Sequence, residues 1–177
     1  MLLVLDATIG ISDQDRTLAE QISRDGRACV VLLNKWDAVA DKDDKTYLKS
    51  IDYVRDMLPA VRWAPVVLVS ALTGQRCPKI YDAIDEAIAS HRRKVSTSAL
   101  NDVLRDAVLW QAPPPAKGGI GKIYYCSQIG VSPPTVAMFC NKPSLFGDNY
   151  KRFLDRKFRE GPYPIAAKLA AAASPVG

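Results

Sequence analysis

The stretch "VVLLNKWD", Val30 to Asp37, joins an apolar run to a polar tetrapeptide, Asn34-Lys35-Trp36-Asp37. A continuous apolar run of this length is typical of a parallel strand that is covered on both faces. The polar residues that follow it predict a loop at the carboxyl edge of the sheet, where open α/β sheets bind their ligands. The stretch therefore indicates an α/β fold with a binding loop directly after one of its strands.

Two similar apolar runs, "LLVLD" and "PVVLVSA", lie on either side of this strand in the sequence. Segments with helical periodicity separate the runs, and Ser12 or Asp13 can cap the first of these helices. The first helix is expected to turn three apolar residues inward, Leu18, Ala19 and Ile22. Strand–helix alternation of this kind predicts a right-handed β/α layer fold over residues 1–94.

The second half of the chain has a different pattern. A helix is predicted from about Ser98, followed by two strand-like runs, "KIYYCSQ" and "TVAMFCN", and by a helix from Asp148 to Glu160. A last strand is expected around Ile165. This order predicts a small α+β domain with an open sheet over residues 95–167 and a disordered tail over residues 168–177.

The tetrapeptide has the chemistry that recognition of a guanine base requires. The carboxylate of Asp37 can accept hydrogen bonds from both N1–H and the 2-amino group of guanine, whereas adenine would leave that charge unpaired. A site built on such bonds rejects an analogue that lacks them by ~10⁴–10⁵-fold. The amide of Asn34 can serve the N7 edge and tie neighbouring loops together. The stem of Lys35 can lie flat over the base.

A second loop, "VSALTG", follows the third apolar run. The small side chain of Ala71 lets a backbone N–H approach guanine O6, and Ser70 can brace Asp37 through a hydrogen bond. The alternative is that Asn34–Asp37 is an ordinary Asx turn after a strand and that Ser70-Ala71-Leu72 is an ordinary helix start. The spacing of both loops on one β/α pattern favours guanine binding.

Composition limits the other classes of function. The formal net charge of +5 and the pI of about 9.0 make an anionic partner plausible. The four cysteines are scattered and His91 is the only histidine, so neither a zinc site nor a His-dependent nucleophile is expected. The apolar start "MLLVL" is too short to span a bilayer. We identify no catalytic and no metal-binding residue, and we expect no membrane partner.

Six segments together resemble one family, the bacterial and plastid GTPases called Der or EngA. They are "LDATIGISDQD", "VVLLNKWD", "VLVSALTG", "VSTSALNDVL", "KIYYCSQIGVSPPTVAMFCNKP" and "YKRFLDRKFRE". The resemblance runs from residue 1 to about 165 and implies the rear half of a second P-loop-NTPase-type G domain followed by a KH-like domain. It implies GTP or GDP as ligand, with Asn34, Lys35, Asp37, Ser70 and Ala71 as guanine-binding residues. It also implies a role in assembly of the large ribosomal subunit, in the bacterial cytoplasm or the plastid stroma.

Three elements of the family have no counterpart in these 177 residues: the phosphate-binding loop, the switch threonine and the Asp-x-x-Gly turn that serves Mg²⁺. The segment "AKGGIGKI" has Ala116 where the loop needs glycine and Ile123 where it needs a hydroxyl, and it precedes a strand. We therefore expect this chain alone to bind nucleotide weakly and not to hydrolyse GTP. The missing N-terminal part of the same protein is a candidate partner.

One basic helix face is a candidate RNA contact. Five cationic residues crowd the polar side of the last predicted helix: Lys151, Arg152, Arg156, Lys157 and Arg159. The first four are the candidate RNA-binding residues. A solvated helix face would have the same composition, whereas the resemblance implies ribosomal RNA. Two alternatives to the GTPase hypothesis follow: a module that binds rRNA or the ribosome by itself, or a truncated gene product without independent function.

Overall fold

A computed structural model of the chain describes residues 1–40, 43–116, 119–160 and 168–173. The chain divides into two compact units, Met1–Ala89 and Ser90–Gly177. Each unit has its own buried core, and each is described by itself. No helix in the described part of the chain has the length and apolar character needed to cross a membrane.

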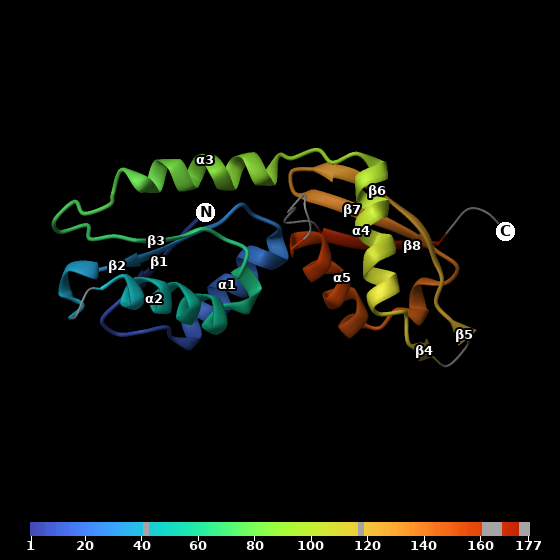
Figure 1. Ribbon diagram of the computed structural model, residues 1–177, viewed down its shortest axis with the longest axis horizontal. Coiled ribbons are helices and arrows are strands. Elements are labelled where there is room, and N and C mark those ends of the chain that lie inside the picture. The colour runs from blue at the N-terminus through green and yellow to red at the C-terminus, as the bar shows by residue number, and fades with distance from the viewer. Residues whose placement is uncertain (41–42, 117–118, 161–167, 174–177) are drawn as a thin grey trace. The chain divides into compact units, whose positions relative to one another are not determined.

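The first unit contains a parallel three-stranded sheet in the order β1-β2-β3. Helices α1 and α2 cover one face of the sheet and α3 covers the other (Figure 1). The elements are β1 (Leu2–Asp6), α1 (Asp13–Asp25), β2 (Val30–Asn34), η1 (Trp36–Ala38), α2 (Asp44–Met57), η2 (Pro59–Val61), β3 (Val66–Leu68) and α3 (Lys79–His91). The predicted β/α layer is confirmed.

Helix α1 shows how the sequence fixes its own boundaries. Ser12 caps the first turn, and its hydroxyl and the carboxylate of Asp15 bond each other's backbone N–H groups in a capping box. Gly26 ends the helix in the left-handed region at φ 66°, which glycine adopts without steric cost. Ala19 and Ile22 are buried as predicted, whereas Leu18 is exposed, so the expectation that Leu18 faces the core is wrong.

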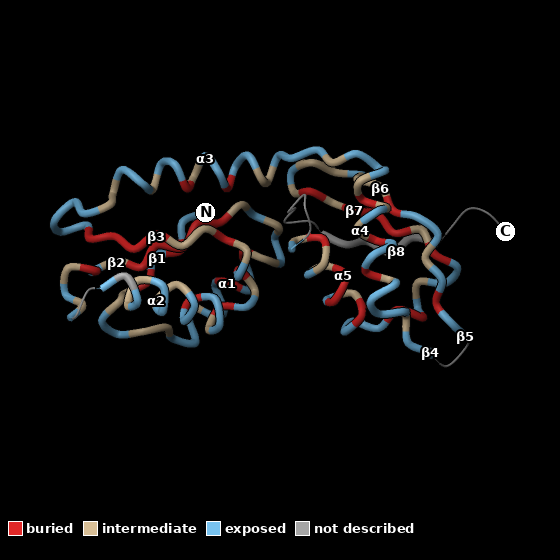
Figure 2. Tube along the Cα trace, viewed as in Figure 1, coloured by how far each residue is buried: buried red, intermediate tan, exposed pale blue. Residues whose placement is uncertain are grey.

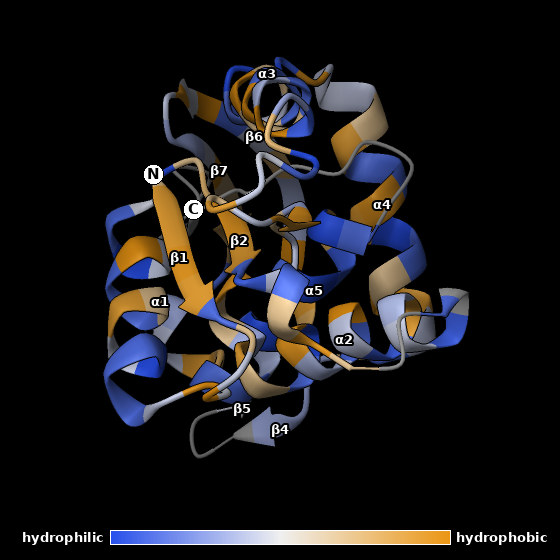
Figure 3. Ribbon diagram, turned by 90° about the vertical axis from the view of Figure 1, so that its left-hand side faces the viewer, coloured by the Kyte–Doolittle hydropathy of each residue, from blue (hydrophilic) through white to orange (hydrophobic). Residues whose placement is uncertain are grey.

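Burial differs sharply between the first two strands. In β2 every residue except Asn34 is buried, so this strand is covered on both faces (Figure 2). In β1 burial alternates: Leu3 and Leu5 are buried, while Leu2 and Val4 are 48% and 55% exposed. The core beneath α3 contains residues of β2 and β3 but none of β1. The expectation of cover on both faces is therefore wrong for β1, which forms a hydrophobic edge (Figure 3).

The second unit packs two helices against one face of a three-stranded sheet in the order β6-β7-β8. Its elements are α4 (Thr97–Trp110), β4 (Pro115–Ala116), β5 (Gly119–Ile120), β6 (Ile123–Val131), β7 (Pro134–Cys140), η3 (Pro143–Leu145), α5 (Asp148–Glu160) and β8 (Lys168–Ala173). Strands β6 and β7 are antiparallel, and β8 runs parallel to β7. The predicted α+β order and open sheet are confirmed.

The end of the chain differs from its prediction. Residues 168–173 form β8 and pair in register with Thr135–Cys140, so the expected disordered tail is wrong over this segment. Alanine has weak strand propensity, and pairing with a neighbouring strand decides its conformation here. The strand expected around Ile165 and the last four residues lie outside the described residues.

Candidate functional site

The carboxyl ends of the three parallel strands in the first unit bring together the loops singled out from the sequence. Asp6 ends β1, Asn34 ends β2, and Ser70 follows β3 by two residues. In the sheet register Asp6 lies opposite Asn34. Because parallel strands end at one edge, all three loops leave the sheet on the same side, which is where α/β folds bind ligands.

Two hydrogen bonds join the second and third of these loops. The side-chain Oδ1 of Asn34 accepts a bond from the backbone N–H of Ala71 at 3.0 Å. The backbone N–H of Trp36 donates to the carbonyl of Val69, also at 3.0 Å. Trp36 is buried in the core formed with α1 and α2. Its side chain therefore fixes the turn that carries Asp37, which is half-buried. The prediction that Asn34 ties neighbouring loops together is thus met.

Lys35 is held by a residue that the sequence analysis did not assign. Its backbone lies in the left-handed region at φ 61°, a conformation that costs a non-glycine residue about 1–3 kcal/mol. Its Nζ lies 2.6 Å from Oδ2 of Asp6 at the end of β1. The other oxygen of Asp6 accepts bonds from the backbone N–H and the hydroxyl of Thr8. The side chain of Lys35 is therefore fixed across the edge of the sheet.

The contact changes the acidity of both partners. The hydrogen bond from Lys35, followed by the bonds from Thr8, lowers the pKa of Asp6 from 3.8 to about 2. The same contact raises the pKa of Lys35. A carboxyl with a lowered folded-state pKa stabilises the fold above its unfolded pKa, and this contribution disappears as the pH falls toward the folded value.

We expect the carboxyl of Asp6 to titrate near pH 2 in the folded chain, as read from its side-chain ¹³C shift. Lys35→Met removes the main cause, so the midpoint should rise toward 3.8. Asp6→Asn should flatten the pH dependence of the free energy of unfolding between pH 4 and 2. A midpoint near 3.8 in the unmodified chain would contradict the ion pair.

The loop after β3 is organised from within. Ser70 is fully buried, and its hydroxyl accepts a bond from the backbone N–H of Thr73 at 3.1 Å. Its carbonyl accepts a weak bond from the thiol of Cys77 at 3.6 Å. The hydroxyl of Ser70 can still donate a hydrogen bond. The predicted bond from Ser70 to the carboxylate of Asp37 stays a prediction. Ala71 is exposed, and its N–H is already engaged by Asn34.

The same loop is also fastened to α2. Arg76 adopts φ 59°, and its guanidinium lies over the ring of Tyr47 at 4.8 Å from the centroid. Sequence reasoning missed this contact, because a cation and an aromatic ring 29 positions apart give no local signal.

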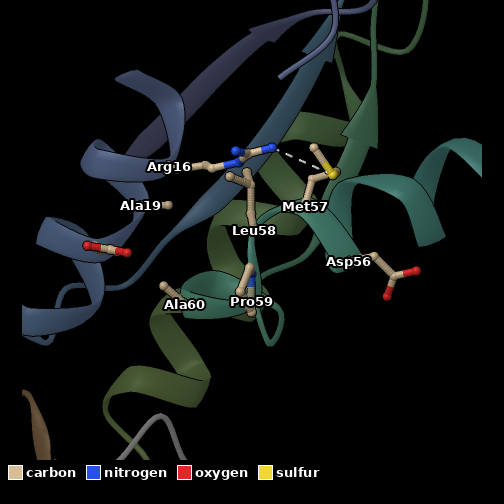
Figure 4. A pocket seen from close by; sticks show the side chains of 8 residues that line it. Arg16, Ala19, Asp56, Met57, Leu58, Pro59 and Ala60 are labelled. Atoms are coloured by element: carbon tan, nitrogen blue, oxygen red, sulfur yellow. Dashed lines mark hydrogen bonds between the residues drawn. The ribbon is translucent and has the colours of Figure 1, made fainter. Parts of the chain in front are cut away.

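A hollow of about 290 Å³ in the first unit lies away from these loops. It is formed by α1 and by the segment joining α2 to η2, and Arg16 crosses it to reach the sulfur of Met57 at 3.8 Å (Figure 4). Its floor is apolar, with Ala19, Leu58 and Pro59. None of the predicted guanine-binding residues lines it.

The four cationic residues predicted to contact RNA all lie on α5, and their environments differ. Lys151 pairs with Asp148 at 3.3 Å, and Lys157 lies over the ring of Trp110 at 5.1 Å. Arg152 and Arg156 are exposed, one helical turn apart, and neither forms an ion pair with the described residues. These two arginines are the part of the face that can bind an anion without breaking an existing contact.

Comparisons with known proteins agree with this geometry. The family profile "Elongation factor Tu GTP binding domain" matches residues 1–90, and "KH-domain-like of EngA bacterial GTPase enzymes, C-terminal" matches residues 94–162. The chain belongs to the GTPase Der family. It is 52% identical over 160 residues to GTPase Der of Gloeobacter violaceus, 49% over 161 residues to that of Gloeothece citriformis and 47% over 161 residues to that of Nostoc punctiforme.

These alignments cover 90% of this chain but only 35% of each Der relative. The chain thus spans about a third of the length of the curated Der proteins that it matches. The resemblance recognised in the sequence, a G-domain portion followed by an EngA-type KH-like domain, is confirmed for the Der family.

Proposed function

We propose that the first unit is the base-reading portion of a guanine-nucleotide site in a Der-type GTP-binding protein. The observation that carries this proposal is the bond between Asn34 Oδ1 and the N–H of Ala71, which joins the Asn-Lys-x-Asp turn to the Ser-Ala-Leu loop. Asp37 would accept the N1–H and the 2-amino group of guanine. Nδ2 of Asn34 would serve N7, and the stem of Lys35, fixed by Asp6, would cover the base.

The base fits this site better than the phosphates and Mg²⁺ do. The site supplies the carboxylate of Asp37, the amide of Asn34 and the backbone of the loop at Ala71, which match the hydrogen-bonding groups of guanine. Within residues 1–40, 43–116, 119–160 and 168–173, no three His, Cys, Asp or Glu side chains are grouped to hold a metal ion. We expect no hydrolysis of GTP by the 177 residues alone, because the sequence contains no phosphate-binding loop, switch threonine or Asp-x-x-Gly turn.

Titration with free nucleosides tests the base site without phosphates. In ¹⁵N-labelled chain, the backbone signals of Trp36 and Ala71 should shift with guanosine and stay in place with adenosine. Asp37→Ala should abolish the shifts, whereas Asp56→Ala, which removes a carboxylate at the separate hollow, should not. Equal responses to both nucleosides would reject the proposed specificity. Micromolar, Mg²⁺-dependent binding of GTP would contradict the expectation that this chain binds nucleotide weakly.

The charge distribution favours a second role, for the second unit. Residues 90–177 contain 13 Lys and Arg against 5 Asp and Glu, whereas residues 1–89 contain 11 against 14. The positive charge of the chain therefore resides in the KH-like unit. We propose that Arg152 and Arg156, flanked by Lys151 and Lys157, contact ribosomal RNA during assembly of the large subunit. Phosphate contacts by Lys and Arg supply most sequence-independent affinity for nucleic acids.

The double variant Arg152→Ala/Arg156→Ala is expected to weaken rRNA binding and to lower the slope of log affinity against log salt by about 1.4, or about 0.7 for each lost contact to a single strand. Filter binding across a salt series measures both quantities. Lys45→Ala/Lys49→Ala removes an exposed pair with the same spacing from α2 and should leave the slope unchanged. Absence of binding at low salt, or equal slopes in both variants, would contradict this role of α5.

A further inference from the structure

The sheet of the second unit has one face that neither of its helices covers. The core formed with α4 and α5 takes Cys126 from β6 and alternate residues of β7, Val136, Met138 and Cys140. Successive side chains of a strand point to opposite faces. Phe139 of β7 and its cross-strand partner Tyr125 of β6 therefore lie on the other face.

An irregularity in β6 adds a second tyrosine to this face. Ile123 pairs with Cys140 and Tyr125 with Phe139, so Tyr124 is one extra residue on its strand, as in a β-bulge. Ile123 packs against the core and Cys126 is part of it. Both intervening residues, Tyr124 and Tyr125, are thus left outside the core, with exposed fractions of 50% and 40%.

The rings on this face are held in fixed orientations. Tyr125 and Phe139 are stacked, with centroids 4.3 Å apart and planes 12° from parallel. Such cross-strand aromatic pairs stabilise a sheet and limit the freedom of both rings. Further along the same face Ala137 is buried, which confines the exposed aromatic surface to the end of the hairpin that starts at Lys122.

Two lysines lie at that end of the hairpin. Oδ1 of Asn141 accepts bonds from the backbone N–H groups of Lys122 and Lys142, both at 2.9 Å, so one side chain holds the two residues together. The ammonium of Lys122 lies 5.6 Å from the ring centroid of Tyr124. Both lysines are exposed, and neither forms an ion pair with the described residues.

We propose that Tyr124, Tyr125 and Phe139, with Lys122 and Lys142 beside them, form a stacking platform for the bases of single-stranded RNA. Aromatic rings on an open sheet provide surfaces on which unpaired bases stack, and adjacent cations hold the backbone. The net positive charge of this unit favours a polyanion over an apolar protein partner. Within the second unit, the platform lies on the sheet face opposite the one that packs against α5.

The test measures binding of a labelled 12-nucleotide single-stranded RNA of mixed sequence to the whole chain by fluorescence anisotropy at low salt. Tyr124→Ala and Tyr125→Ala should each weaken binding about tenfold, a typical loss for one stacked base. Tyr124→Phe and Tyr125→Phe keep the rings and should stay within about twofold of the unmodified chain. Circular dichroism checks that each variant is folded.

A second probe separates stacking from charge. An oligomer of the same length without bases should bind the unmodified chain as weakly as the Tyr124→Ala/Tyr125→Ala variant binds RNA. That variant should keep its salt slope, whereas Lys122→Ala/Lys142→Ala should lower the slope by about 1.4. Arg152→Ala/Arg156→Ala should leave the preference for RNA over the baseless oligomer unchanged. Full RNA affinity in the folded double tyrosine variant, or no preference for bases, would overturn the proposal.

Discussion

Asp37→Asn is expected to reverse the base preference of the guanine site, weakening guanine at least about a hundredfold while strengthening xanthine. The carboxylate accepts from both N1–H and the 2-amino group, whereas an amide offers one acceptor and one donor. Xanthine has a carbonyl oxygen at C2, so it matches the amide. The corresponding substitution is made in the full-length GTPase Der of Gloeobacter violaceus, at the position that aligns with Asp37. Titration of that protein with guanosine and xanthosine diphosphates measures the change.

Two further variants show whether the effect belongs to this carboxylate. Asp37→Ala should weaken both bases, because it removes the acceptor without supplying a donor. Asp6→Asn disturbs the position of Lys35 and should weaken guanine and xanthine alike. Unchanged selectivity in the Asp37→Asn protein would show that another residue reads the base.

The second large effect is expected at the hydrophobic edge of the first unit. Among the described residues β1 pairs only with β2, and Leu2 and Val4 expose their side chains beside it. A hollow of about 150 Å³ adjoins this edge, lined by Leu2, Val30 and Ile84 among others. An unpaired apolar strand is a template for association. The isolated chain should therefore self-associate as its concentration rises, and its melting temperature should depend on concentration.

The double variant Leu2→Lys/Val4→Lys should lower this association by at least about tenfold, because charged side chains on an edge strand oppose pairing with another strand. Sedimentation velocity over a concentration series measures the change. Leu48→Lys places a lysine at an equally exposed leucine of α2 and should leave association unaltered. A chain that is monomeric at all concentrations, with cooperative melting, would contradict the prediction.

Much of the fold could be predicted from the sequence, because the apolar runs and helix caps favour the same structure as the packing between elements. The apolar run of β2 predicts burial on both faces, and the structure places it in the middle of the sheet. Ser12 and the glycine at residue 26 fix the ends of α1. The loops at Asn34 and Ala71 could be paired in advance, because parallel strands share one carboxyl edge.

Other features depend on contacts that carry no local signal. Asp6 looks like the polar end of a strand, and only its approach to Lys35 reveals a role. The exposure of Leu2 and Val4 depends on how far α3 extends across the sheet, which a run of apolar residues does not show. The outward turn of Tyr124 follows from a one-residue shift in strand pairing. Strand β8 is built from alanines, and its partner strand alone determines its conformation.

The unequal distribution of ionised residues has a practical consequence for handling the molecule. With 11 basic and 14 acidic residues before position 90, and 13 basic and 5 acidic residues from there on, the halves have opposite net charge near neutral pH. A protease cut between the halves would release one fragment that migrates toward the anode and one that migrates toward the cathode. The intact polypeptide would be retained on a cation exchanger through its carboxyl-terminal half.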